Sequence, residues 1–412
     1  MENDLFAQPG ASARRVARLR QALEREGLDA FLVCDTSDIM WLSAFDGVFD
    51  DEAAHALLVT RDAATLHTDS RYSTAARAAA ASEGVVEVND ERVGHAAFAA
   101  AALSAQAGGE ASGVACGGAA GAGRCELGIE DSLPLSRFRA LERAFGLDDA
   151  SDAEGVGREH AAGREGVATP VRLRETSDVV LGLRAVKEPC EIRRLKAAQA
   201  VTDAAFDHIT GFIRTGMTER EVQIELEDFM RRHGADGLAF SSIVATGANG
   251  ANPHAVPGRT RLEAGQCVVI DFGARAWGYC SDMTRTVFLG RPSERLAEAY
   301  AAIREANERV EAALAPGVTG RAMHELAEEV LAERGFAGRM GHGLGHGVGI
   351  DIHEQPALSP RNEKPLEQGN VVTVEPGVYL PGEFGMRLED CGVLTDAGFE
   401  PFTRSTHEMV VL

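Results

Sequence analysis

The second half of the chain repeats itself, and this repeat restricts the possible folds more than any other feature of the sequence. Segments 216–234 and 317–335 both run Gly-apolar-Thr, then an amphipathic helical pattern, then Gly, at an offset of 101: "GMTEREVQIELEDFMRRHG" and "GVTGRAMHELAEEVLAERG". In the first copy, Thr218 and Glu221 have the spacing of a capping box, which marks the start of a helix. Each copy therefore predicts an amphipathic helix bounded by glycines.

A second echo follows the first in the same order. The stretch "LEAGQCVVID" at 262–271 matches "LEQGNVVTVE" at 366–375, at an offset of 104. A single echo arises easily by chance, because Gly-Thr helix starts are common. Two echoes in the same order and at nearly the same offset rarely arise by chance. We therefore predict two related halves that meet across a pseudo-twofold axis.

Acidic residues occupy matching places in the two copies. The stretch 269–286, "VIDFGARAWGYCSDMTRT", has two strand-like runs around a glycine-containing turn and carries Asp271 and Asp282. If the runs form a hairpin, their separation of eleven lets the aspartates lie directly opposite each other, where they repel unless a proton or a cation lies between them. The second copy supplies Glu375 and Glu389. Four such carboxylates could hold two divalent ions about 3.5–4 Å apart.

Three histidines lie in one glycine-rich segment, "RMGHGLGHGVGIDIHEQP" at 339–356. His342 and His346 have the spacing of a helical zinc pair, but the intervening Gly-Leu-Gly disfavours a helix, and no Glu follows His342. On an extended segment these two side chains point the same way. With His353 close by, three histidines beside four carboxylates favour a functional site over structural hydrogen bonding. One imidazole with several oxygens suits Mn²⁺ or Co²⁺ better than a thiolate-preferring metal.

The first half alternates helical and strand patterns. A helix is predicted at 13–26, ended by Gly27, and buried strands are predicted in "DAFLVCD" and "HALLVTRDAATLHTD". This alternation is typical of an α/β domain. Two stretches without periodicity follow, Gly/Ala-rich at 108–123 and acidic at 148–167, and we interpret both as surface insertions.

The length of 412 residues favours two domains, because one hydrophobic core rarely grows that large. The boundary is predicted after the two insertions, which gives domains at 1–172 and 173–412. The net charge of −22 argues against nucleic-acid and anionic-membrane partners. Seven scattered cysteines without a CxxC pair fit reduced thiols, so we expect a cytoplasmic protein.

Five residues match, in order, the metal ligands of the M24 metallopeptidases: Asp271, Asp282, His346, Glu375 and Glu389. The chain resembles the Xaa-Pro branch of this pita-bread family, which includes prolidase and aminopeptidase P, in "VIDFGARAWGYCSDMTRT", "GHGLGHGVGIDIHEQP" and "VEPGVYLPGEFGMRLED". The stretches "LEREGLDAFLV" and "LHTDSRY" are similar to the creatinase/prolidase N-terminal domain. The resemblance implies an α/β N-terminal domain followed by a pseudo-twofold pita-bread catalytic domain, as in the short bacterial Xaa-Pro peptidases.

The resemblance also implies a mechanism. Two divalent ions, Mn²⁺ first and Co²⁺ or Zn²⁺ as alternatives, would hold a bridging hydroxide that attacks the carbonyl before proline. His353 would stabilise the oxyanion, and Glu375 would pass a proton to the leaving nitrogen. His254, in "NPHAVPG", matches a catalytic histidine of the branch. His342 and Arg387 would bind or orient the substrate.

Several alternatives stay open at this point. Arg387 could instead pair with a carboxylate ligand, since it lies two residues before Glu389 on one strand. The substrate could be an Xaa-Pro dipeptide or a longer peptide. A related fold could hydrolyse another small amide of the ectoine or creatine type, or serve as a non-catalytic binding protein, but relatives of those kinds tend to lose metal ligands, and here all five positions are filled.

A homodimer is a further expectation that comes from the resemblance. In similar two-domain peptidases, the N-terminal domain packs against a second subunit and limits substrate length. The segment 38–45, "DIMWLSAF", is the expected exposed segment that reaches the neighbouring cleft. Trp41 and Phe45 lie four residues apart and could equally belong to the core.

Overall fold

The computed structural model describes residues 6–50, 52–107, 124–147 and 170–412. The insertions expected at 108–123 and 148–167 lie outside the described residues. The chain forms two compact units, Gln8–Leu183 and Arg184–Leu412, and the second also includes Phe6 and Ala7. Strand β6 (Val171–Thr176) crosses the expected boundary at 172 and pairs with the N-terminal sheet, so the units divide later, after Leu183.

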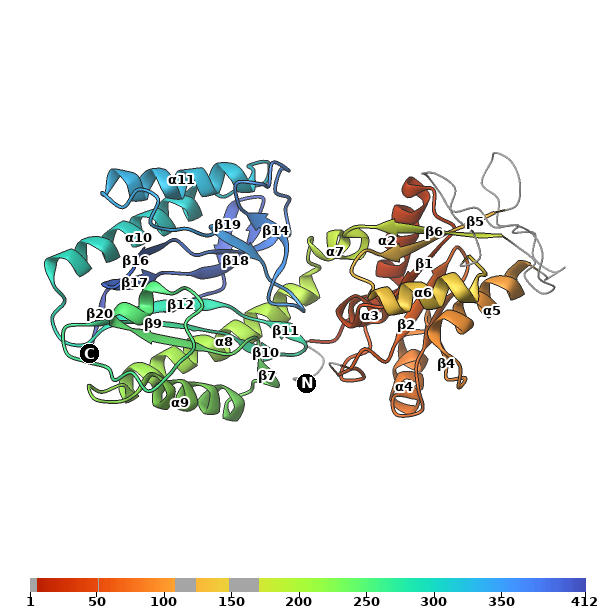
Figure 1. Cartoon of the computed structure of the whole chain (residues 1–412), viewed down its shortest axis with the longest axis horizontal. Coiled ribbons are helices and arrows are strands. Elements are labelled where there is room, and N and C mark those ends of the chain that lie inside the picture. Colours follow the sequence, from red (N-terminus) through yellow and green to blue (C-terminus); the bar gives the residue numbers. More distant parts are fainter. Residues whose placement is uncertain (1–5, 51, 108–123, 148–169) are drawn as a thin grey trace. The chain divides into compact units, whose positions relative to one another are not determined.

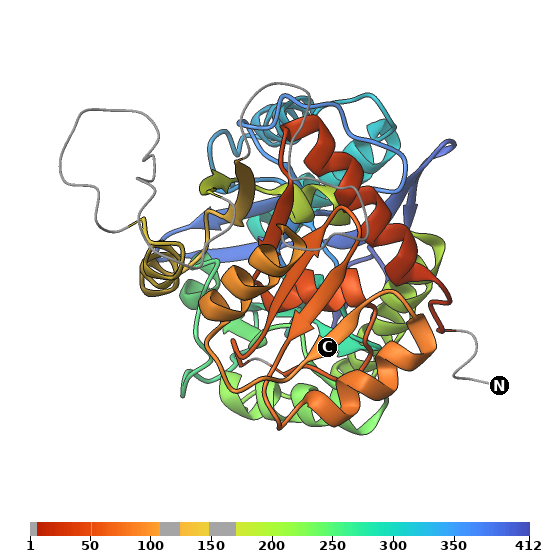
Figure 2. The same ribbon diagram turned by 90° about the vertical axis from the view of Figure 1, so that its right-hand side faces the viewer.

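The N-terminal unit is a mixed six-stranded sheet in the order β4-β3-β2-β1-β5-β6, covered by helices (Figures 1 and 2). Its strands are β1 (Ala30–Val33), β2 (Ala56–Thr60), β3 (Ala64–His67), β4 (Glu87–Asn89), β5 (Cys125–Glu130) and β6. Its helices are α2 (Ala11–Glu26), α3 (Thr36–Ser43), α4 (Ser73–Glu83), α5 (His95–Ala107), α6 (Leu135–Ala144) and α7 (Val179–Arg184).

Local sequence accounts for the first elements of this unit. Helix α2 buries Val16, Leu19 and Leu23 on one face. It ends where Gly27 takes a left-handed conformation with φ of 66°, which costs glycine little because it has no Cβ. The apolar strands β1 and β2 are buried at every position. The predicted helix, its stop and the two strands are therefore confirmed.

The expectation that segment 38–45 is exposed is wrong. Trp41 and Phe45 are each only 1% exposed, and both belong to the core of their own unit. Arg15 donates a hydrogen bond to the Trp41 carbonyl at 2.8 Å and lies over the indole ring at 5.1 Å. Asp35 caps helix α3, which holds the apolar side chains of the segment inward. This segment therefore cannot reach into a neighbouring subunit without unfolding.

The second unit consists of two similar halves, with α8 and α9 covering one half and α10 and α11 covering the other (Figure 1). The first half contains α8 (Pro189–Phe212), α9 (Glu219–Arg232), β7 (Gly237–Leu238), β8 (Ile243–Thr246), η1 (Gly247–Ala251), β9 (Cys267–Phe272), β10 (Ala274–Ala276), β11 (Tyr279–Cys280) and β12 (Met283–Phe288). The second contains α10 (Glu294–Ala313), α11 (Gly320–Glu333), β13 (Gly345–Gly347), β14 (Glu354–Leu358), β15 (Val371–Val374), β16 (Gly377–Leu380), β17 (Phe384–Arg387), β18 (Asp390–Thr395) and β19 (Gly398–Pro401), and β20 (Val410–Val411) returns to β12.

The predicted internal repeat is confirmed. Thr218 caps α9 and Thr319 caps α11, each through a side chain that accepts a hydrogen bond from the first turn. Each half then forms an antiparallel strand pair, β9 with β12 in the first and β15 with β18 in the second. Each half also has its own apolar core between its helices and its strands. The strands of the two halves therefore lie inside and the helices outside (Figure 1).

Among the described helices, none combines the length and the apolar composition that a membrane span requires.

The register of the first strand pair corrects one detail. Asp271 pairs with Thr284, not with Asp282, which lies two residues earlier and just before β12. Strands β10 and β11 continue this hairpin in the same register, and its two-residue turn at Trp277 and Gly278, both with positive φ, sets the pairing. Because side chains alternate along a strand, the two-residue offset keeps both aspartates on one face as diagonal neighbours. In the second half, the register would place Glu375 opposite Glu389.

Candidate metal centre and active site

All nine residues singled out from the sequence line one pocket of about 490 Å³ in the second unit. They are His254, Asp271, Asp282, His342, His346, His353, Glu375, Arg387 and Glu389. They come from β9, β13 and β17, from the segments next to β12, β13, β14, β15 and β18, and from the loop after η1, so both halves contribute. The structure thus brings the predicted residues together, while the role of each one stays a prediction.

Acidic and imidazole side chains converge at the base of this pocket. His346 Nε2 lies 3.5 Å from Asp282 Oδ2 and 3.5 Å from Glu375 Oε1. Ligand atoms of Asp282, His346 and Glu389 all lie within 4.8 Å of one another. This spacing is short enough for a single cation to contact all three residues.

The carboxylates are buried close to one another, which is costly without a counter-charge. Asp282 is 4% exposed and Glu389 is 2% exposed. Burial and the neighbouring charges of Glu389 and Asp271 raise the pKa of Asp282 well above its usual value. Burial and the charges of Glu375 and Asp271 do the same to the pKa of Glu389. A divalent cation would remove this repulsion by binding the oxygens directly.

The imidazole of His346 is oriented for ligation. Its Nδ1 lies 3.0 Å from the carbonyl oxygen of Gly347. Because a carbonyl oxygen can only accept a hydrogen bond, Nδ1 must carry the proton and act as the donor. The lone pair is then on Nε2, the atom that faces Asp282 and Glu375. Burial lowers the pKa of His346, which keeps the ring neutral. A carbonyl that fixes the tautomer in this way is the usual support for a metal-binding histidine.

The glycines around His346 are needed for close strand packing. A Cβ at Gly345 would collide with the carbonyl oxygen of Thr373, and one at Gly347 would collide with that of Gln355. Strand β13 can therefore approach β14 and β15 only with glycine on both sides of the histidine. The glycine-rich pattern thus has a packing cause that is independent of any helix.

Two threonines that sequence reasoning missed hold the acids in place. Thr284 Oγ1 donates to Glu389 Oε2 at 2.6 Å, and Thr373 Oγ1 donates to Glu375 Oε1 at 3.3 Å. The His346 backbone N–H donates to the same Thr373 oxygen at 3.0 Å. Strand alternation could have identified Thr284, because it lies two residues after Asp282 and so shares its face.

Arg387 makes its contacts inside the cluster. Its guanidinium pairs with Asp271, lies 3.7 Å from Glu375 Oε2, and donates to Thr284 Oγ1 at 2.9 Å. It also donates at 2.8 Å to Tyr379 Oη, which lies 3.1 Å from His342 Nε2. The alternative in which Arg387 pairs with ligand carboxylates matches these contacts. Its role in substrate binding stays a prediction, and Tyr379 is a further residue that no sequence signal indicated.

The two histidines predicted to act on the substrate lie at the exposed side of the pocket. His254 and His353 are both exposed, and the His353 ring packs edge-on against His346 with ring centroids 4.4 Å apart. Burial and the nearby His346 lower the pKa of His353, which favours its neutral form. Phe240, Ile243 and Ile352 add apolar side chains to the lining. The lining therefore combines imidazoles, carboxylates and apolar side chains.

Glu354 anchors the turn that carries His353. Lys187 donates to Glu354 Oε2 at 2.9 Å, Arg184 pairs with Oε1, and the Asp351 backbone N–H donates to Oε1 at 3.1 Å. Burial opposes ionisation, but the charges of Lys187 and Arg184 lower the pKa of Glu354 to about 2. This carboxylate is therefore charged and fully paired, which fixes the backbone next to His353.

The donor set fits divalent ions. Four carboxylates and one neutral imidazole face a common space, and Asp271, Glu375 and Glu389 also accept a hydrogen bond or ion pair from a threonine or an arginine. Oxygen ligands with one nitrogen suit Mn²⁺, Co²⁺ or Zn²⁺. No cysteine lines the pocket, which excludes a thiolate site.

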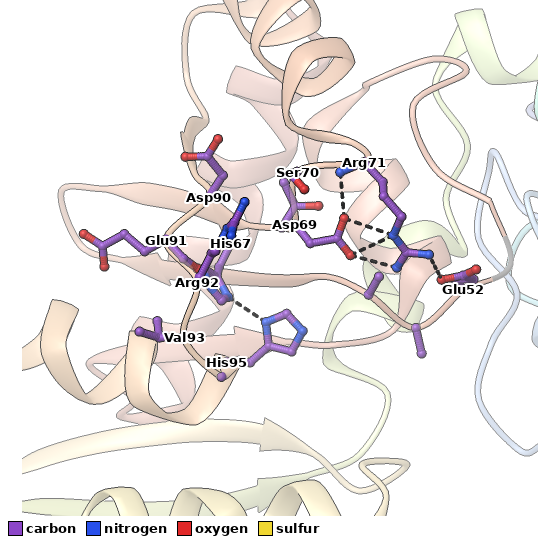
Figure 3. Close-up of a pocket in the computed structure, with 14 residues that line it drawn as sticks. Glu52, His67, Asp69, Ser70, Arg71, Asp90, Glu91, Arg92, Val93 and His95 are labelled. Carbon is purple, nitrogen blue, oxygen red and sulfur yellow. Dashed lines mark hydrogen bonds and ion pairs between the residues drawn. The ribbon is translucent and has the colours of Figure 1, made fainter.

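A larger cavity of about 650 Å³ lies in the N-terminal unit (Figure 3). Charged side chains that line this cavity pair with one another: Arg71 forms ion pairs with Glu52 at 2.6 Å and with Asp69 at 2.7 Å. His67 and His95 face each other there with 2.7 Å between their Nδ1 atoms (Figure 3). Within the described residues, no third ligand-type side chain converges on this pair, so we place the candidate active site in the smaller pocket.

Comparison with known proteins gives a consistent result for both units. The sequence model described as Metallopeptidase family M24 matches residues 193–396, and the one described as Creatinase/Prolidase N-terminal domain matches residues 15–159. An uncharacterized peptidase of Bacillus subtilis, YqhT, is 32% identical over 398 residues, which cover 97% of this chain and 100% of the relative. The similarity therefore extends over both units.

Solved structures agree with the fold. The Xaa-Pro dipeptidase from Bacillus anthracis superposes with a TM-score of 0.82 at 33% identity, covering 97% of this chain and 100% of that one. The X-Pro aminopeptidase from Thermotoga maritima gives a TM-score of 0.76 at 32% identity, covering 94% and 99%. The predicted order of an α/β N-terminal domain and a pseudo-twofold pita-bread domain is confirmed.

Proposed function

Because the chain belongs to metallopeptidase family M24, we propose that it is an Xaa-Pro peptidase that hydrolyses the bond between an N-terminal residue and proline. One observation carries the proposal: the five residues that match the family's ligands converge in a single buried pocket with two exposed histidines at its open side. Solved structures named for Xaa-Pro cleavage match the chain over nearly its full length, which supports the choice of substrate class.

We assign two divalent ions, with Mn²⁺ as the first choice, to this pocket. The ligands would be Asp271, Asp282, His346, Glu375 and Glu389. Bound there, the ions would supply Lewis-acid chemistry that polarises the substrate carbonyl and makes water a stronger nucleophile near neutral pH. The threonines and Arg387 would hold the ligand oxygens in position.

The remaining residues have proposed roles of their own. His353 would donate a hydrogen bond to the oxygen of the scissile carbonyl as negative charge develops there. Glu375 would accept the proton that the attacking water loses and pass it toward the proline nitrogen. His254, on the exposed loop before β9, lines the same pocket and would contact the substrate there. His342, held by Tyr379 and the Gly343 carbonyl, would line the space for the leaving proline.

A direct assay tests the substrate. Metal-stripped protein supplied with Mn²⁺ is expected to hydrolyse Ala-Pro, with Ala-Ala as the control that lacks the imide bond. Cleavage of Ala-Pro-Ala in addition would indicate an aminopeptidase, and cleavage of Ala-Pro alone would indicate a dipeptidase. Equal rates on Ala-Pro and Ala-Ala, or full activity without metal, would contradict the proposal.

We also propose that the chain forms a homodimer in the cytoplasm, acts on proline-containing di- or oligopeptides, and binds neither nucleic acid nor membranes. The dimer rests on the resemblance, and the location is consistent with the six described cysteines, none of which forms a disulfide. Sedimentation equilibrium at micromolar concentration is expected to give twice the mass of the 43.7 kDa chain. A monomer that retains full peptidase activity would remove the dimer proposal.

A further inference from the structure

A second cluster of ligand-type side chains lies outside the pocket described above. It consists of Asp390 at the start of β18, Glu311 on α10, and His407 in the C-terminal segment. One ligand atom from each of the three residues lies within 4.8 Å of the others. Asp390 directly follows Glu389, but none of the three lines the peptidase pocket.

The two carboxylates of this cluster are paired to different degrees. Asp390 is 1% exposed, and its Oδ2 forms an ion pair of 2.7 Å with His407 Nε2. Glu311 Oε1 is also buried, but no described residue donates a hydrogen bond to it. A buried carboxylate oxygen is rarely left in this state, because losing water without gaining a donor is costly. Glu311 Oε1 therefore faces the cluster without a donor of its own.

The neighbouring groups are arranged as supports for a bound cation. Arg285 donates to the other Asp390 oxygen, Oδ1, at 2.7 Å, which directs Oδ2 into the cluster. The other ring nitrogen of His407, Nδ1, lies 3.6 Å from a carboxylate oxygen of Glu308. Tyr300 Oη donates to the His407 carbonyl at 3.2 Å and fixes its backbone. A carboxylate behind the histidine and a donor behind the aspartate are typical of metal sites.

We propose that Asp390, Glu311 and His407 bind a divalent metal ion of the Zn²⁺ or Mn²⁺ type, separate from the ions of the peptidase pocket. Three protein ligands, one nitrogen and two oxygens, are a donor set that such ions accept, with water completing the coordination. The ion would join α10 and the C-terminal segment to β18, directly behind Glu389. Its role would be structural, because none of the three residues lines the peptidase pocket.

The competing explanation is a trapped proton. Burial and the nearby charge of Asp390 raise the pKa of Glu311 to about 8, so without metal this carboxyl would be protonated at neutral pH. A protonated Glu311 would reduce the repulsion with Asp390, and His407, whose pKa is raised by its contact with Asp390, would stay paired with that carboxylate. The two explanations differ in whether the protein takes up an extra metal ion.

The experiment measures bound Zn²⁺ after dialysis, by elemental analysis, in a background that carries Asp282→Asn and His346→Asn to weaken the peptidase centre. The test variant adds Glu311→Gln. The matched control adds Glu298→Gln, which removes an exposed acid from the same helix. A third variant, His407→Gln, removes a half-buried ligand with little disturbance of the core.

We expect the background protein and the Glu298→Gln control to hold one Zn²⁺ per chain, and the Glu311→Gln and His407→Gln variants to bind it more than about 100-fold more weakly, since even supporting residues of metal sites change affinity by 10–100-fold. Zn²⁺ should also raise the melting temperature of the control and not of His407→Gln. Equal Zn²⁺ in all four proteins, or none in the background protein, would overturn the proposal. Because Zn²⁺ uptake is measured without substrate, a missing peptidase activity would leave this result unaffected.

Discussion

Replacing Asp282 with asparagine is expected to remove metal from the peptidase pocket and to reduce Ala-Pro hydrolysis by at least about 10³-fold. Asp282 lies 3.5 Å from His346 Nε2, and its ligand atom lies within 4.8 Å of those of His346 and Glu389. Its replacement therefore removes a charged metal ligand from the centre of the site. Metal-ion polarisation of a carbonyl is worth several kcal/mol, and each 1.4 kcal/mol is about tenfold in rate. Metal content and the steady-state rate on Ala-Pro measure the effect.

The same substitution should stabilise the metal-free protein. The pKa of Asp282 is raised in the folded state, so the charged carboxylate destabilises the fold at any pH above its unfolded value. A neutral asparagine removes this cost. The melting temperature of metal-free Asp282→Asn should therefore exceed that of the metal-free natural chain, while added Mn²⁺ should raise the melting temperature of the natural chain much more than that of the variant.

Asp228→Asn is the matched control for this experiment, because Asp228 forms only an exposed helical ion pair with Arg232. It should leave metal content, rate and melting temperature nearly unchanged. If Asp282→Asn kept both its metal and its activity, the assignment of the carboxylates as ligands would fail. A lower melting temperature in the metal-free variant would show that the acids do not repel as the geometry implies.

Replacing His353 with alanine is expected to reduce turnover by about 10²–10³-fold while the protein keeps its metal. The ring of His353 packs against His346, and it is exposed on the lining of the pocket where a substrate carbonyl would lie. Losing one donor to a developing oxyanion typically costs this much in rate. The effect should appear in kcat more than in KM, because the interaction strengthens as charge develops.

His254→Ala is expected to behave in the same way, since His254 lines the same pocket and is also exposed. His233→Ala is the matched control, because His233 is exposed at the end of α9 and does not line the pocket. Metal analysis on all three variants separates a loss of catalysis from a loss of ions. Near-normal rates in both pocket variants would show that His254 and His353 are not catalytic residues.

Most of the architecture could be predicted from local patterns. The repeat at 216–234 and 317–335 predicted two capped helices, and both form with Thr218 and Thr319 as caps. Helix α2 ends at Gly27 as its sequence indicates. These features depend on residues within a few positions of one another, so capping, periodicity and a left-handed glycine are sufficient to specify them.

The register and the partners could not be predicted in this way. The opposition of Asp271 and Asp282 required a different turn position, but the hairpin turns at Trp277 and Gly278, which pairs Asp271 with Thr284. Trp41 is part of an apolar segment whose sequence fits an interface and a core equally well. In the folded unit it contacts Arg15, which lies 26 residues earlier in the chain.

The sequence by itself therefore determined the two-part fold, the internal repeat and the set of residues that gather in the pocket, because types and spacings of residues are local properties. Only the tertiary structure decided what each of them contacts. In the folded chain, Arg387 pairs with Asp271 and donates a hydrogen bond to Tyr379. Thr284 and Thr373 donate hydrogen bonds to the glutamates, and Glu311 lies close to Asp390. These contacts join residues from different elements, so they form only when the two halves pack together. Packing buries the charged groups close to one another, and a buried charge is costly unless it has a partner.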